Sequence, residues 1–203
     1  MNSLKAIYPN GLRLPLRPFE PEVITFASKY RIQTYLPNSI LHNGGNDAGA
    51  LGEGMVWRWM NKNGMPVDPA GAFDYDLVSK GGRRIEVKTV QTKKKFVDLD
   101  DWTNIEDRST RGQVYLQDCD VYIHCRVNVE EMVGTIIGFC TPMQVATRWR
   151  MFLKGEHGEK GWVASHDCAS ARYDALCPLS SLEDYLRKID PKAPRMRYSL
   201  HPV

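Results

Sequence analysis

The sequence predicts an α/β fold in which a mixed central sheet is flanked by helices. Its 203 residues are 42% hydrophobic and 25% charged, which is typical of a globular domain and not of a disordered or fibrous chain. Segments with helical spacing are interleaved with two pairs of strand-like segments, in residues 73–91 and 121–140. We therefore expect a single domain over residues 1–203.

The first third of the chain predicts an arm followed by two helices. Met1–Pro21 contains four prolines and should form an extended arm. Pro21 is a favourable first-turn residue for a short helix over Glu22–Tyr35. A longer helix is expected from Ala48 to about Lys62. Its apolar residues recur at helical spacing: Leu51, Met55 and Trp59.

The middle of the chain predicts two hairpins. Phe73–Ser79 and Arg84–Gln91 are strand-like, and the glycines in Lys80–Arg83 between them indicate a tight turn. Val121–Val127 and Val133–Cys140 have the same strand-like character. Both pairs would contribute strands to the central sheet.

The last third of the chain predicts two more helices around a loop. Pro142–Leu153 has a helical period, Lys154–Gly161 is a glycine-rich loop, and Ser180–Ile189 is a final helix. The chain would then have three parts: an N-terminal arm and short helix in 1–45, a core in 48–141, and a C-terminal helical and loop elaboration in 142–203.

Composition also limits the compartment and the partners. The longest apolar runs fall short of the roughly 18 residues that a membrane helix needs, so no membrane partner is expected. The N-terminus lacks the apolar segment and cleavage pattern of a secretory signal. Five cysteines without C-x-x-C spacing indicate free thiols, and we expect a cytoplasmic protein.

Charge is distributed unevenly along the middle of the chain. Lys80–Lys95 holds seven basic residues and one acid, and the following Asp98–Asp107 holds five acids and no lysine or arginine. A local basic surface of this kind can attract a polyanion. A solvated lysine-rich loop balanced by an acidic one explains the pattern equally well.

Two acids and a lysine fall on matching positions of the first predicted hairpin. Side chains alternate between faces along a strand, so Glu86 and Lys88 point the same way. Asp76 shares their face only if the residue numbers of each pair across the hairpin add to an even number. A two-residue Gly81-Gly82 turn would pair Lys80 with Arg83, whose numbers add to an odd number. We therefore expect a three-residue loop or a bulge at this turn.

These charges fit a divalent metal site. Two carboxylates and an ammonium at the edge of a core are costly unless they bind something. Asp76 and Glu86 offer oxygen ligands suited to Mg²⁺, and the Val87 carbonyl can add a third. Lys88 can orient an attacking water or stabilise charge on a phosphate, which together is the chemistry of phosphodiester hydrolysis. An exposed hairpin with alternating charges is the structural alternative.

The same residues resemble the PD-(D/E)xK nuclease superfamily, the restriction-endonuclease-like fold. The resemblance lies in Gly52-Glu53 near the start of a helix, in Phe73–Val78, and in Arg84–Thr89 after a glycine turn. It covers roughly Ala48–Gln91, and Asp120–Thr141 is similar to the later strands of such proteins. It implies a restriction-endonuclease-like αβββαβ core with a mixed central sheet, and makes residues 48–141 a catalytic core.

The resemblance also implies an activity and a set of roles. The protein would be a Mg²⁺-dependent deoxyribonuclease, an endonuclease, in which Mn²⁺ can substitute for Mg²⁺. Asp76 and Glu86 would be metal ligands, Lys88 the catalytic lysine, and Glu53 an additional ligand from the first helix. The proline that usually precedes the aspartate is absent, since Asp76 follows Tyr75, and Asp74 has the same parity and competes for the ligand role.

DNA is the expected partner. Lys93, Lys94 and Lys95 directly follow the lysine-bearing strand, and Arg148 and Arg150 flank a tryptophan, so these five residues are candidate phosphate contacts. A homodimer would supply two active sites for cutting both strands. Two other interpretations stay open: a non-catalytic nucleic-acid-binding module with the nuclease fold, and an interaction protein whose segment Asp98–Asp107 contacts a basic partner.

Overall fold

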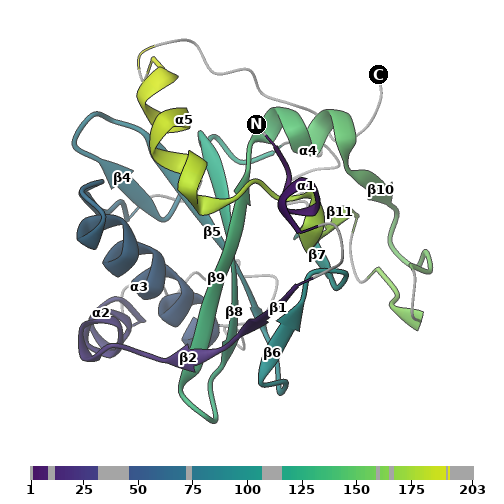
Figure 1. The fold of residues 1–203 in the computed structure, drawn as a ribbon, viewed down its shortest axis with the longest axis horizontal. Coiled ribbons are helices and arrows are strands. Elements are labelled where there is room, and N and C mark those ends of the chain that lie inside the picture. Colours follow the sequence, from purple (N-terminus) through teal and green to yellow (C-terminus); the bar gives the residue numbers. More distant parts are fainter. Residues whose placement is uncertain are drawn as a thin grey trace.

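The described residues form a mixed α/β fold in which helices flank a curled, mixed sheet, as the sequence predicts at this level (Figure 1). The computed structural model describes residues 2–8, 12–31, 46–71, 75–106, 116–158, 161–164, 167–190 and 192. No helix within these ranges is long and apolar enough to cross a membrane.

Six strands make up the main sheet, in the order β2–β9–β8–β5–β4–β3. They are Arg17–Pro18 (β2), Val67–Pro69 (β3), Leu77–Ser79 (β4), Arg84–Gln91 (β5), Val121–Asn128 (β8) and Val133–Cys140 (β9). β5 and β8 are parallel, and the other neighbouring pairs of this sheet are antiparallel. Both faces of β8 are buried, so its apolar residues do not alternate strictly with polar ones, and His124 and Asn128 are buried as well.

The β4–β5 hairpin has the even register that the sequence analysis requires. Leu77 pairs with Ile85, and Ser79 N–H donates to Arg83 O at 2.9 Å, leaving a three-residue loop, Lys80–Gly82. Gly82 has φ of +79°, a left-handed conformation that glycine adopts without steric cost. The expected three-residue loop is therefore confirmed.

Two helices lie on one side of the main sheet in Figure 1, the second packed on the strands and the first packed mainly on the second. They are α2 (Pro21–Arg31) and α3 (Asn46–Lys62). Val56 and Met60 of α3 share an apolar cluster with Val87 of β5 and Ile123 of β8. The short helix α5 (Leu182–Lys188), which follows a 3₁₀ turn at Leu179–Ser181, adds to the same cluster.

The opposite face is covered by smaller elements, on the right in Figure 1. A three-stranded sheet contains β10 (Arg150–Phe152), β11 (Cys168–Arg172) and β7 (Trp102–Glu106), in that order. A two-stranded sheet joins β1 (Arg13–Pro15) to β6 (Phe96–Asp98). The remaining elements here are α1 (Leu4–Ile7), α4 (Pro142–Arg148) and a 3₁₀ turn at Tyr173–Ala175. Their apolar side chains pack on Tyr122 and Cys140 of the main sheet.

Several expected elements differ from those observed. The helix expected over Pro142–Leu153 is α4 followed by β10, because residues 150–152 pair with β11 far along the chain. The arm in residues 1–21 contains α1, and its extended part joins the two-stranded sheet through β1 and the main sheet through β2. Between β5 and β8, the described residues contain β6 and β7 and no helix, so the αβββαβ order is present only as α3–β3–β4–β5 and then β8.

Candidate active site

Asp76 lies where strands β4 and β5 separate. Its backbone N–H donates to Ile85 O at 3.0 Å, although Leu77 is the residue paired with Ile85, so the ladder is irregular at this end. The next hydrogen bond to β5 is made by the Asp76 side chain: its Oδ2 accepts from Val87 N–H at 2.7 Å. The end of β4 thus places a carboxylate beside the middle of β5.

Glu86, on the adjoining position of β5, is almost fully buried and has 3% of its surface exposed. Its Oε1 accepts two hydrogen bonds, from Lys88 Nζ at 2.8 Å and from Gln117 Nε2 at 2.6 Å. The expectation that Glu86 and Lys88 point the same way is confirmed by the first contact. No described residue donates to Glu86 Oε2, so that oxygen is available to a ligand.

Glu53 reaches the same place from helix α3. Its carboxyl group is partly buried, and burial together with the nearby charge of Glu86 raises its pKa to about 7. Helix α3 can approach this closely because residue 52 is a glycine: a Cβ there would lie 1.9 Å from Thr89 Oγ1. The close helix–strand packing therefore carries Glu53 toward Glu86.

Besides burial, the charge of Glu86 helps to raise the pKa of two neighbouring carboxyl groups, Glu53 and Asp76. Burial is the largest cause that raises the pKa of Asp76 well above its usual value, followed by the charges of Glu86 and Glu53. The Val87 N–H and the Lys88 ammonium oppose this shift. Carboxylates gathered in this way repel one another unless protons or a cation neutralise them. Three oxygen donors of this chemistry fit a hard divalent cation such as Mg²⁺ or Mn²⁺.

The Val87 carbonyl belongs to the same edge of β5. Within a strand, the N–H and C=O groups of one residue point toward the same neighbouring strand. Because Val87 N–H faces the Asp76 carboxylate, its carbonyl also faces the side from which β4 departs. The backbone therefore offers a fourth oxygen beside Asp76.

Buried polar groups line the far side of Lys88. Its Nζ lies 5.8 Å from the centre of the Tyr122 ring, and its strand partner on β8 is His124. Burial, assisted by the Lys88 charge, lowers the pKa of His124 to about 3, so this imidazole is neutral near pH 7. Its Nδ1 lies 2.9 Å from Thr103 Oγ1 and its ring packs on Trp149. We therefore assign His124 to the core.

The five candidate DNA contacts are exposed side chains. Lys93, Lys94 and Lys95 form the connection from β5 to β6, where Lys94 pairs with Asp101 at 2.9 Å and Lys93 lies 3.7 Å from Glu130. Arg148 ends α4, and Arg150 lies over the Phe152 ring at 4.4 Å. Within the described residues, no hydrogen bond or ion pair joins these five to the carboxylates. Trp149 between the two arginines is buried and unable to stack on a base.

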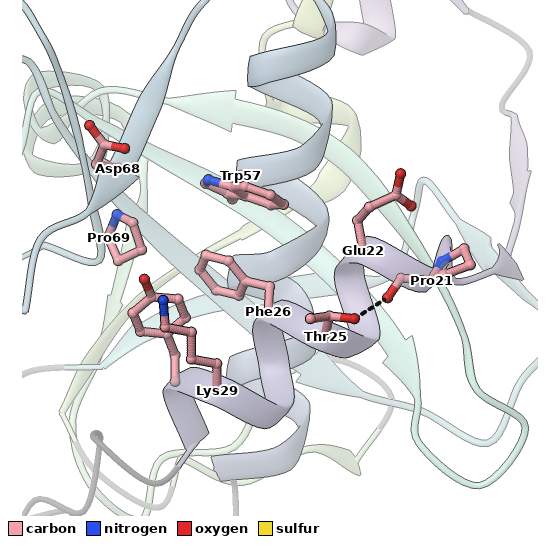
Figure 2. Close-up of a pocket in the computed structure, with 9 residues that line it drawn as sticks. Pro21, Glu22, Thr25, Phe26, Lys29, Trp57, Asp68 and Pro69 are labelled. Carbon is pink, nitrogen blue, oxygen red and sulfur yellow. Dashed lines mark hydrogen bonds between the residues drawn. The ribbon is translucent and has the colours of Figure 1, made fainter.

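A pocket of about 400 Å³ lies elsewhere, between α2, α3 and β3 (Figure 2). Three of its nine lining residues are aromatic, and the Phe26 and Trp57 rings are stacked 5.1 Å apart. Lys29 and Asp68 also line it. None of the predicted site residues lines it. The pocket therefore does not contribute to the carboxylate site.

Among the described residues, the group of three acids whose oxygens all lie within 4.8 Å of one another is Asp98, Asp100 and Asp101 on the surface, and not Glu53, Asp76 and Glu86. Two of its members already form ion pairs, Asp98 with Arg13 and Asp101 with Lys94. Exposed acids of this kind are common without a metal, and we assign them no site.

Sequence reasoning missed Gln117 and could not resolve the choice of aspartate. Gln117 precedes β8 in a segment without strand or helix periodicity, so nothing in the sequence indicates its contact with Glu86. Asp74, the competing ligand, lies outside the described residues. The contact of Asp76 with Val87 supports Asp76 for the site.

Comparison with known proteins does not identify a relative. No family model matches this chain, and no curated protein and no solved structure matches it either. The candidate site is therefore argued from its own geometry.

Proposed function

We propose that this protein is a Mg²⁺-dependent deoxyribonuclease of the PD-(D/E)xK type that cuts DNA internally. The observation that carries the proposal is the convergence of three carboxyl groups and one lysine where β4 and β5 separate: Glu53, Asp76, Glu86 and Lys88. The raised pKa values of Glu53 and Asp76 support a cation as the missing partner.

The order of elements around the site supports the same class. A helix bearing an acid is followed by three antiparallel strands, β3, β4 and β5, and then by β8, which is parallel to β5. This order agrees with most of the restriction-endonuclease-like αβββαβ core. We propose that fold family for the chain, with β6 and β7 in the part where the core would have its second helix.

The proposed reaction assigns a role to each side chain. Asp76, Glu86, Glu53 and the Val87 carbonyl would hold the cation. When bound, Mg²⁺ would polarise a phosphoryl oxygen and make hydroxide available near neutral pH. Lys88 would orient the attacking water and stabilise negative charge that develops on the phosphate. Its ammonium can exchange its hydrogen bond with Glu86 for one to the substrate, because Gln117 remains on the same oxygen.

The proposal is tested by incubating the purified protein with supercoiled, linear and single-stranded DNA in Mg²⁺ or Mn²⁺, with EDTA as control. We expect metal-dependent cutting, including relaxation of the supercoiled form. Glu86→Ala and Lys88→Ala should each lower the cleavage rate by ~10²–10⁴-fold, because each removes a group that acts on the reacting atoms.

Folding is checked by circular dichroism for each variant, and Lys80→Ala serves as the matched control. Lys80 is an exposed lysine in the turn of the same hairpin, so its loss should leave the rate near that of the wild type. Absence of cutting of every DNA form, together with absence of Mn²⁺ binding by calorimetry, would favour a non-catalytic module instead.

A further inference from the structure

The side chain of Gln117 is buried beside the carboxylates and only half of its amide has a partner. Gln117 is 8% exposed, and its Nε2 donates to Glu86 Oε1 at 2.6 Å. Its Oε1 is buried, and no donor among the described residues reaches it. The reverse orientation of the amide would set a carbonyl oxygen against a carboxylate oxygen at the same distance, so the hydrogen bond fixes which atom faces Glu86.

The backbone around Gln117 is held to the sheet at several points. Gln117 N–H donates to Tyr122 Oη at 3.0 Å, and Tyr122 is the strand partner of Glu86. Farther along, Arg84 N–H donates to Asp120 Oδ2 at 2.7 Å and Asp120 N–H donates to Arg84 O at 2.8 Å. These bonds fasten the segment that bears Gln117 to β5 and β8, so its amide is held in a defined position.

The two carboxylate oxygens of Glu86 differ in their hydrogen bonds. Oε1 is occupied by Lys88 Nζ and Gln117 Nε2, while Oε2 accepts nothing from the described residues. A ligand carboxylate that is hydrogen-bonded on one oxygen presents the other in a fixed direction. The free Gln117 Oε1 shares a carbon with Nε2, so it lies close to Glu86 and can accept a hydrogen bond from a water molecule in the site.

We propose that Gln117 is a positioning residue of the metal site, which orients Glu86 toward the cation through Nε2 and accepts from a water molecule through Oε1. The inference rests on the proposed function, because it assumes that the carboxylates bind a divalent cation. It adds that Gln117 keeps Glu86 in place when Lys88 turns to the substrate. Outer-sphere partners of this kind typically change metal affinity by 10–100-fold.

The test is Gln117→Met, which keeps the length and volume of the side chain but removes both hydrogen-bonding atoms. We expect the Kd for Mn²⁺, measured by calorimetry on the full chain, to rise by about 10–100-fold. The Mg²⁺ concentration for half-maximal cleavage should rise in parallel, while DNA affinity in EDTA stays unchanged. Gln117→Asn, which keeps the amide but shortens the side chain, provides a second variant if the first does not fold.

Gln91→Met is the matched control, because Gln91 is exposed at the end of β5 and should bind Mn²⁺ as the wild type does. Wild-type Mn²⁺ affinity in a folded Gln117 variant would overturn the inference and leave the nuclease proposal standing. A wild-type protein that binds no Mn²⁺ and cuts no DNA would overturn both.

Discussion

At the scale of single residues, two acids of the site each have one carboxylate oxygen hydrogen-bonded by the protein and one that accepts from no described residue. Asp76 Oδ2 accepts from Val87 N–H, and Glu86 Oε1 accepts from Lys88 and Gln117. Both acids are thus oriented before a cation arrives, which reduces the entropy lost when the cation binds.

Ionisation of Glu53 should destabilise the metal-free protein. Its pKa is raised from 4.5 to about 7 by burial and Glu86, so the folded state holds this proton more tightly than the unfolded state. The stabilisation from this group is full below the unfolded pKa and is lost as the pH rises through about 7. We expect the Tm in EDTA to fall between about pH 5 and pH 8, and Glu53→Gln to reduce that fall by about 2–4 °C for each kcal/mol that the ionisation of Glu53 costs.

Thermal melts of the two proteins across this pH range provide the measurement, with Glu130→Gln as control. The Glu130 carboxylate is largely exposed, so its removal should leave the pH dependence as in the wild type. Identical pH dependence in the wild type and Glu53→Gln would contradict the proposed environment of Glu53.

Much of the residue-level site could be predicted from strand parity. Parity alone places Glu86 and Lys88 together, and the even register of the hairpin is the condition under which Asp76 shares their face of the sheet. Gln117 could not be predicted, because its position depends on hydrogen bonds to Tyr122 and Glu86 and not on a local pattern.

At the scale of elements, the contact of α3 with β5 determines where Glu53 lies. Gly52 faces Thr89, whose Oγ1 is buried without a hydrogen-bond partner among the described residues. The backbone of α3 therefore packs directly on Thr89 of β5, and only a Cα hydrogen of Gly52 fits between them. A side chain of any size at residue 52 would move the helix and with it the carboxylate.

Gly52→Ala should both destabilise the protein and weaken the site. The new Cβ would lie 1.9 Å from Thr89 Oγ1, so either the helix or Thr89 must shift, at a cost of about 1–3 kcal/mol in the free energy of unfolding. Urea titration measures this cost, and calorimetry measures the accompanying loss of Mn²⁺ affinity.

Gly49→Ala, in the same helix, is the matched control. A Cβ at residue 49 meets only Glu53 Oε1, at 4.0 Å, so alanine fits there and should stabilise the helix by roughly 0.5–1 kcal/mol. Equal effects of the two substitutions would contradict the close packing of α3 on β5.

Elements that arise from local sequence patterns were predicted more closely than elements that depend on pairing between distant parts of the chain. The strands β5, β8 and β9 and the helix α3 arise from local patterns and lie within two residues of their predicted bounds, whereas the strand predicted over Phe73–Ser79 is seen in the described residues only as β4, Leu77–Ser79. Residues 150–152 continue a helical apolar period but form β10, because pairing with β11 buries Phe152 against Cys168 and Ala164. Such long-range pairing overrides local propensity.

At the scale of the whole molecule, the cations that could attract DNA form no hydrogen bond or ion pair with the proposed catalytic groups within the described residues. The net charge is only +3, so attraction depends on where the cations lie. The connection from β5 to β6 presents three exposed lysines, and acids pair with Lys93 and Lys94. A phosphate would have to displace these acids.

Replacing Lys93, Lys94 and Lys95 with alanine should weaken DNA binding and reduce its salt dependence. Each phosphate contact contributes about 0.9 to the slope of log K against log salt, so a loss of about 1–3 in slope is expected. Fluorescence anisotropy with a labelled duplex at several salt concentrations measures it.

The matched control replaces Lys154, Lys188 and Lys192, which are also exposed and give the same change in net charge. An unchanged slope in the Lys93–Lys95 variant, or an equal loss in the control, would place the DNA contact on another face.

The parallel pairing of β5 with β8 also determines when the site can form during folding. Val87 pairs with Ile123, so a long stretch of chain must be closed into a loop before these strands meet. Gln117 reaches Glu86 only after that closure, whereas the β4–β5 hairpin closes over a short loop and can form early. Asp76 and Val87 can therefore meet early in folding, whereas the arrangement around Glu86 is completed only after β8 has joined β5.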